Sequence, residues 1–148
     1  RISVVNGVNP QDVLLDTLVK PEWPVIDHRT FVNGITKQHL EHVTFTLQHA
    51  QAFMMALCSD ETVVCGHSVQ NDLAAVCMQH DCNADSAFLF AVKDEPTATP
   101  GLKDLAMGLL QKEMPETHDS VNDARVALEC LIYYVQHNGN VPPVPRSF

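Results

Sequence analysis

The segment THDSVNDARVALECL, residues 117–131, has a polar first half and an apolar, helix-forming second half. A helix that begins near Ser120 explains both, because Asp119 is a good N-cap and the helix dipole favours an acid such as Asp123 in the first turn. On such a helix one face is apolar and consists of Val121, Ala124, Leu128, Leu131 and Val135. The segment therefore predicts a helix over about residues 120–137 that packs on a core and keeps its polar first turn accessible.

The polar first turn holds groups that can carry out acid–base chemistry. Asp123 is expected beside the apolar face, and His118, just before the helix, can lie over that carboxylate. A histidine in this position is suited to act as a base on a metal-bound water. Asp72, in the second polar cluster GHSVQNDL (residues 66–73), is a candidate second carboxylate for Mg²⁺ or Mn²⁺. The alternative is that Asp119 and Ser120 are ordinary N-caps, that the helix dipole favours acids in its first turns, and that eight histidines place some beside aspartates by chance. Both interpretations stay open on spacing alone.

Around these clusters, β-rich and helical segments alternate along the chain. Strands are expected at residues 1–6, 12–19, 62–67 and 84–90, and helices at 44–58, 69–80, 102–111 and 120–137. The turn-forming GVNPQ (residues 7–11) predicts a hairpin between the first two strands. The nearly all-apolar TVVCGH (residues 62–67) predicts a strand buried on both faces, after which Ser68 can cap a helix. This order indicates an α/β fold, a mixed sheet with helices on its faces.

Composition limits the class of protein. The 148 residues, 45% hydrophobic, fit one domain with a core, and no apolar run of bilayer-spanning length occurs, so we expect a soluble protein without membrane association. A net charge of −9 with nine Lys and Arg argues against a broad basic surface for duplex nucleic acid. The five cysteines form no CxxC pair and predict buried thiols in an intracellular, reducing compartment. Nucleus, cytoplasm and mitochondrion are not distinguished.

These clusters resemble motifs of a known family. HDSVNDARVAL (residues 118–128) is similar to the third motif of the DEDDh 3′–5′ exonucleases, in which a histidine precedes the final aspartate by five positions. GHSVQNDLAAV (residues 66–76) is similar to their second motif. The order of RISVVN, VKPEWPVIDHRTFVNGIT, ADSAFLF and PGLKDLAMGLL matches the eukaryotic RNA exonuclease and deadenylase branch. The resemblance covers residues 1–138 and implies an RNase H-like exonuclease domain, followed by a Pro-rich C-terminal tail at residues 139–148.

The resemblance implies a function and a role for individual residues. It implies a metal-dependent enzyme that removes nucleotides from single-stranded RNA 3′ ends, with DNA as an alternative substrate. Two Mg²⁺ or Mn²⁺ ions would bind the scissile phosphate, with Asp123 and Asp72 as metal ligands and His118 taking the proton of the attacking water. The loop of Asn33, Gly34 and Ile35 matches the place where family members hold the terminal nucleotide.

One departure from the family leaves activity undecided. The family's first motif, a D-x-E pair on a strand just before the one resembling RISVVN, occurs nowhere in residues 1–148. The chain thus lacks the family's first, central strand, and unpaired sheet edges should result. Arg1 at the start favours an upstream segment, a strand without the acids is a second possibility, and a strand donated by a partner is a third. Without the acids the protein would be an inactive scaffold, without metal, in a ribonucleoprotein or protein assembly.

Overall fold

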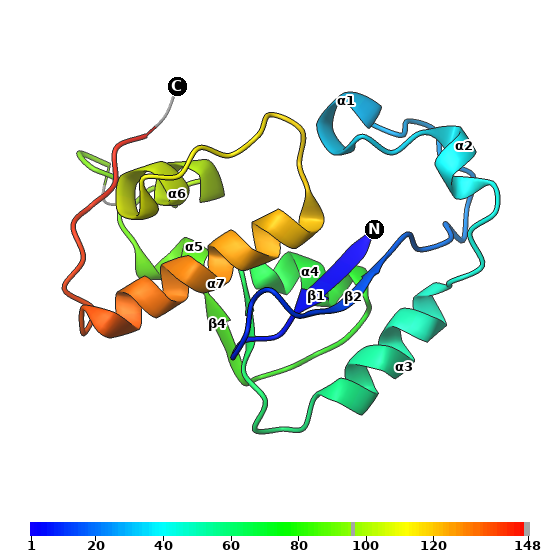
Figure 1. Ribbon diagram of the computed structural model, residues 1–148, viewed down its shortest axis with the longest axis horizontal. Coiled ribbons are helices and arrows are strands. Elements are labelled where there is room, and N and C mark those ends of the chain that lie inside the picture. The colour runs from blue at the N-terminus through cyan, green and yellow to red at the C-terminus, as the bar shows by residue number, and fades with distance from the viewer. Residues whose placement is uncertain (96, 147–148) are drawn as a thin grey trace.

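The computed structural model describes residues 1–95 and 97–146, and its helices and strands form an α/β arrangement. The strands are β1 (Ile2–Val5), β2 (Val13–Thr17), β3 (Val64–Gly66) and β4 (Asn83–Asp85). The helices are α1 (Thr30–Asn33), α2 (Lys37–Leu40), α3 (Leu47–Leu57), α4 (Val69–Ala75), α5 (Ser86–Leu89), α6 (Leu102–Leu110) and α7 (Ser120–Gln136). Helix α7 runs across the molecule, and α1, α2 and α3 lie to one side of the strands (Figure 1).

Strands β1 and β2 form the expected hairpin. They pair antiparallel, with Ser3 opposite Asp16, and the register shifts between Val4 and Val5. The connecting turn is closed by a hydrogen bond from the Asn6 amide to the Asp12 carbonyl, at 2.9 Å. The hairpin prediction is confirmed.

Strands β3 and β4 form a separate parallel pair, with Cys65 opposite Ala84 and helix α4 in the crossover between them. Within the described part of the chain the mixed pairing is thus divided between two two-stranded sheets. Helix α7 contacts β1 of one sheet and β3 of the other, so it links them without any hydrogen-bonded strand between.

Two strand predictions are wrong in detail. Strand β3 is not buried on both faces, since Cys65 is exposed and Val63 just before it is 55% exposed. Among residues 1–95 and 97–146, β3 pairs with β4 alone, so no second neighbouring strand flanks these side chains. The predicted strand at residues 84–90 ends at Asp85, because the Asp85 side chain accepts a hydrogen bond from the Ala87 amide and starts helix α5 there.

The core lies between α6, α7 and the segments that flank them. Its buried members include Phe90, Leu105, Val126, Cys130 and Val144. Gly108 on α6 is required by this packing, because a Cβ at that position would lie 2.9 Å from Val144 Cγ1. The Pro-rich segment thus packs on α6, with Val144 paired to Val92 as a short parallel bridge. This core anchors α7 and with it the polar turn at its start.

Two further sequence expectations concern cysteines and membranes. All five cysteines are free, but only Cys130 is buried; Cys65 and Cys77 are exposed, so the prediction of buried thiols is wrong for them. Burial raises the pKa of the Cys130 thiol to about 12. Among the residues described, no helix has the length and apolar character needed to cross a bilayer.

Candidate active site

Helix α7 begins where the sequence predicted. Asp119 is the N-cap, and its carboxylate accepts a hydrogen bond from the Asn122 amide at 2.9 Å. Asp123 lies in the first turn, with its amide bonded to the Asp119 carbonyl at 2.8 Å. Capping therefore falls to Asp119, which leaves the Asp123 carboxylate available for other contacts.

His118 and Asp123 are in contact. His118 Nδ1 lies 3.2 Å from Asp123 Oδ2, and the two side chains are 52% and 26% exposed. When Nδ1 donates to the carboxylate, the other ring nitrogen, Nε2, is the basic one. The geometry agrees with the sequence expectation of a histidine over a first-turn carboxylate. The catalytic role of the pair stays a prediction.

The loop after α1 reaches the same place from a distant part of the chain. The His118 amide donates to the Val32 carbonyl at 2.8 Å, which joins α1 to the segment before α7 (Figure 1). Asn33 shapes the loop, because its Nδ2 donates to the His28 carbonyl at 3.0 Å and its Oδ1 accepts from the Ile35 amide at 2.8 Å. Gly34 has a φ of 70°, a left-handed conformation that suits glycine.

A pocket of about 210 Å³ collects these groups. It is lined by Arg1, Asn33, Ile35, His118, Ser120 and Asp123. The candidate substrate residues and the His118–Asp123 pair therefore share one depression. Gly34 and Asp72 are not among the lining residues; Gly34 contributes the turn that presents its two neighbours.

Arg1 is a pocket residue that sequence reasoning missed. Its guanidinium donates twice to the Asp16 carboxylate, at 2.8 Å each, and once to Asp119 at 3.3 Å. The hydrogen bonds from Arg1, followed by that from Ser3, hold the pKa of Asp16 below its usual value. Arg1 therefore links Asp16 of the hairpin to Asp119 at the start of α7. The one sequence feature that could have indicated this contact is the hairpin register, which brings Arg1 close to Asp16 on the facing strand.

Asp72 lies in the first turn of α4, outside the pocket. Although the residue is exposed at the surface, the surrounding protein excludes enough water to raise the pKa of its carboxyl, with the charge of Asp85 as a lesser cause. Two acids thus stand near each other where α4 begins. The charged form of Asp72 is disfavoured in the folded protein.

We expect Asp72→Asn to stabilise the metal-free protein by less than about 1 kcal/mol, since solvent screens an exposed group. A raised pKa means that the folded state binds the proton more tightly than the unfolded chain. Stability is therefore lost as the pH rises from the ordinary aspartate value, near 4, through the raised value, and the loss persists at neutral pH. Denaturant unfolding at about pH 4 and 7 would measure it. Asp60→Asn, at another exposed acid, is the control, and equal effects of the two changes would contradict the prediction.

The donor types present suit a hard divalent cation, but their number does not complete a site. Asp123 and Asp72 supply carboxylate oxygens, which Mg²⁺ and Mn²⁺ prefer. Among residues 1–95 and 97–146, however, no group of three or more His, Cys, Asp or Glu side chains is placed to hold a metal ion. A metal-binding role for Asp123 and Asp72 therefore stays a prediction.

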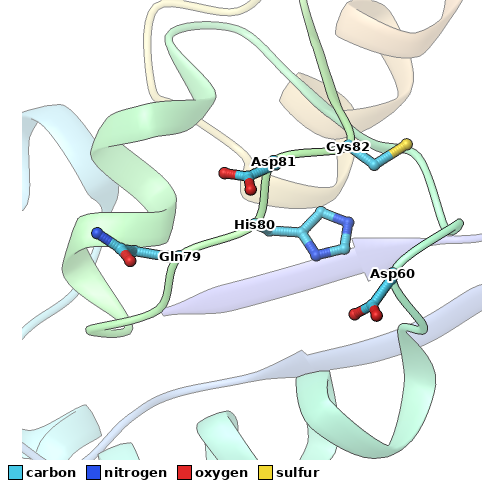
Figure 2. A pocket seen from close by; sticks show the side chains of 5 residues that line it. All are labelled: Asp60, Gln79, His80, Asp81 and Cys82. Carbon is cyan, nitrogen blue, oxygen red and sulfur yellow. The ribbon is translucent and has the colours of Figure 1, made fainter.

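A second pocket, of about 400 Å³, lies elsewhere and is lined by Asp60, Gln79, His80, Asp81 and Cys82. Figure 2 shows the His80 ring at its centre, with the Cys82 sulfur directed away. His80 Nε2 lies 2.6 Å from the Thr62 carbonyl, so the ring already connects two loops. This pocket shares no residue with the one that contains His118.

Comparison with curated proteins finds relatives that are named as nucleases, although no family model matches the chain. The chain is 37% identical to RNA exonuclease 1 of Saccharomyces cerevisiae over 131 residues, which are 87% of this chain and 23% of that protein. It is 36% identical to apoptosis-enhancing nuclease of Rattus norvegicus over 138 residues, 87% of this chain and 40% of that one. It is 32% identical to small RNA degrading nuclease 3 of Arabidopsis thaliana, over 84% of this chain and 16% of that one. The chain thus spans less than half the length of each.

Solved structures share the fold. The Neurospora crassa Pan2 catalytic unit, comprising protease and nuclease domains, matches with a TM-score of 0.80 at 24% identity, over 93% of this chain and 24% of that one. The Saccharomyces cerevisiae Pan2 pseudoubiquitin hydrolase and RNA exonuclease module, solved with AAGGAA RNA, matches with a TM-score of 0.72 at 20% identity, over 92% of this chain and 24% of that one. At these identities the likeness concerns the fold.

Proposed function

Because this chain belongs to the DEDDh-type RNA exonuclease family and has its RNase H-like fold, we propose that the protein removes nucleotides from the 3′ ends of single-stranded RNA. The observation that carries the proposal is the contact between His118 and Asp123 in a pocket that Asn33 and Ile35 also line. The relatives' names and the RNA present in the Pan2 structures agree with an RNA substrate. A pocket of about 210 Å³ suits a single terminal nucleotide better than a longer stretch.

In this proposal each pocket residue has a distinct task. His118 accepts the proton of the attacking water at Nε2, while Asp123 holds Nδ1 and the orientation of the ring. Asn33, Gly34 and Ile35 bind the terminal nucleotide. The hydrogen bond from the His118 amide to the Val32 carbonyl ties this loop to the segment that carries the catalytic histidine.

The proposal includes two Mg²⁺ or Mn²⁺ ions, with Asp123 and Asp72 among their ligands. When bound, such ions supply an activated water and stabilise the charge on the leaving 3′ oxygen. Asp123 and Asp72 leave most coordination positions of two ions to water and substrate phosphate, and in this proposal further acids fill some of those positions.

We propose that these acids lie on a strand between β1 and β3. Helix α7 contacts both strands, although they belong to different sheets. It therefore packs against an edge strand of each sheet, and among the described residues neither strand has a second pairing partner. A strand between β1 and β3 would form hydrogen bonds with the backbone N–H and C=O groups at the edges of these strands. It would also cover the exposed Val63 and Cys65. A D-x-E sequence on that strand would complete the metal ligands.

The function is tested with the full-length natural protein and a 5′-labelled RNA that ends in a 3′ hydroxyl. We expect the RNA to be shortened from its 3′ end with Mg²⁺ or Mn²⁺, and shortening to stop when EDTA is added and resume when excess metal is restored. Gel analysis of the labelled products shows the direction of degradation, because 5′-labelled intermediates persist only when the RNA is degraded from its 3′ end. Activity that persists in EDTA would contradict the proposal.

The alternative is an inactive scaffold in a ribonucleoprotein or protein assembly. The observation that favours it is the absence of D-x-E from all 148 residues, together with the net charge of −9. Sequencing the N-terminus of the natural protein for any residues before Arg1 separates the two functions. A β-rich segment with D-x-E supports the enzyme, whereas a strand without these acids, combined with inactivity in both metals, supports the scaffold.

A further inference from the structure

The segment of residues 20–42, which contains α1 and α2, exposes large apolar side chains. Trp23 is 77% exposed, Ile26 is fully exposed and Phe31 on α1 is 81% exposed. Isolated exposed apolar residues are ordinary, but here two of the largest side-chain types occur within nine positions of one another. The segment lies at one side of the molecule, next to the start of α7 (Figure 1).

Segment 20–42 also differs in charge from the rest of the protein. It holds three of the nine basic residues and three of the 18 acids, which leaves six basic and 15 acidic residues elsewhere. The segment is therefore neutral with its histidines uncharged, and the whole net charge of −9 falls on the other residues. Three of the eight histidines are in it: His28, His39 and His42. A polyanion meets less repulsion along this neutral segment than along the acidic segments of the chain.

Segment 20–42 is continuous with the candidate active site. Its own Asn33 and Ile35 line the pocket that contains His118, and its Val32 carbonyl accepts the His118 amide at 2.8 Å. Phe31 is the residue before Val32 and lies within the short helix that leads to Asn33. A strand whose terminal nucleotide occupies the pocket must leave it across the surrounding surface, and segment 20–42 forms one side of that surface.

From these three observations we propose that segment 20–42 is the path of single-stranded RNA upstream of the terminal nucleotide, with bases stacking on Phe31 and Trp23. This proposal rests on the proposed function and adds the surface that holds the substrate. Stacking on aromatic rings tolerates any base and needs few phosphate contacts, which suits a protein with nine basic residues. Affinity in this protein then comes from aromatic side chains more than from a basic groove.

Binding and turnover are measured separately in the full-length protein. Binding of a fluorescent single-stranded RNA of about 12 nucleotides is followed by anisotropy in an Asp123→Asn background, which is expected to slow turnover about a thousandfold. We expect Phe31→Ala and Trp23→Ala each to weaken binding by about tenfold. Phe88→Ala is the matched control, because Phe88 is 70% exposed on another short helix, α5, and should change binding by less than about twofold.

Turnover is measured on the same RNA and on the p-nitrophenyl ester of thymidine 5′-monophosphate, a diester too small to reach the path. We expect Phe31→Ala to lower kcat/KM on the RNA by about tenfold more than on the small diester. If Phe31→Ala and Phe88→Ala behave alike on both substrates while the wild type hydrolyses both, the path is wrong and the exonuclease proposal survives.

Two other outcomes separate the proposals further. If the wild type hydrolyses neither substrate but RNA binding still depends on Phe31 and Trp23, the path is supported and the exonuclease proposal fails. If both substitutions leave RNA binding intact and instead release a protein that copurifies with the wild type, segment 20–42 is a protein interface and the RNA path is overturned.

Discussion

Asp123→Asn is expected to lower the rate of RNA shortening by about a thousandfold, within the range of about 10² to 10⁴ for losing positioned acid–base catalysis. The reason is that Asp123 has two tasks in the proposed site. It holds the His118 ring through the 3.2 Å contact at Nδ1, and it offers its carboxylate as a metal ligand. Asparagine keeps the shape of the side chain but loses the charge that both tasks need. His118→Ala should have an effect of similar size.

The measurement is single-turnover shortening of labelled RNA at saturating Mg²⁺, so that product release does not hide the chemical step. Glu129→Gln is a matched control, since it removes one carboxylate from the same helix at a position that pairs with Lys112 away from the pocket. Thermal unfolding should show that Asp123→Asn keeps the fold. More than a tenth of wild-type activity in correctly folded Asp123→Asn would remove this residue from the catalytic site.

Asp85→Ala is expected to destabilise the region around α4 by about 3 kcal/mol, the largest loss of stability that we predict from a single polar side chain. The Asp85 carboxylate accepts three backbone hydrogen bonds, from Ser68 at 2.7 Å and from Val69 and Ala87 at 2.9 Å each. It therefore caps α4 and α5 together and ties both to strand β4. Alanine would leave these amides without their acceptor.

Amide hydrogen exchange measures this loss locally, which matters in a protein whose relatives are much longer. We expect exchange at Ser68, Val69 and Ala87 to accelerate by about 100-fold, the factor that corresponds to about 3 kcal/mol. Asp60→Ala, at an exposed acid of the loop after α3, should leave these amides unchanged. An acceleration below about fivefold would show that solvent replaces Asp85 as the acceptor.

Asp85 also illustrates what the sequence did not reveal. The sequence indicated Ser68 as the cap of α4, since it is the serine just before the helix. In the structure Ser68 has a φ of 59° and makes no side-chain capping bond. Its amide instead bonds to a carboxylate 17 positions away. Helix α4 also ends at Ala75, earlier than predicted, and the helix propensities of the neighbouring residues do not indicate this end.

The sequence by itself determined the features that depend on neighbours along the chain. The hairpin and helix α7 could be predicted because turn residues, an N-cap and an apolar stripe act within a few positions. The pairing of His118 with Asp123 belongs to the same class, since five positions across a helix start bring them together. The tertiary structure alone decided the features that depend on distant segments: the meeting of Asn33 and Ile35 with His118, the double cap by Asp85, and the division of the strands into two sheets. Such contacts depend on how the chain folds back on itself, and no local pattern encodes that path.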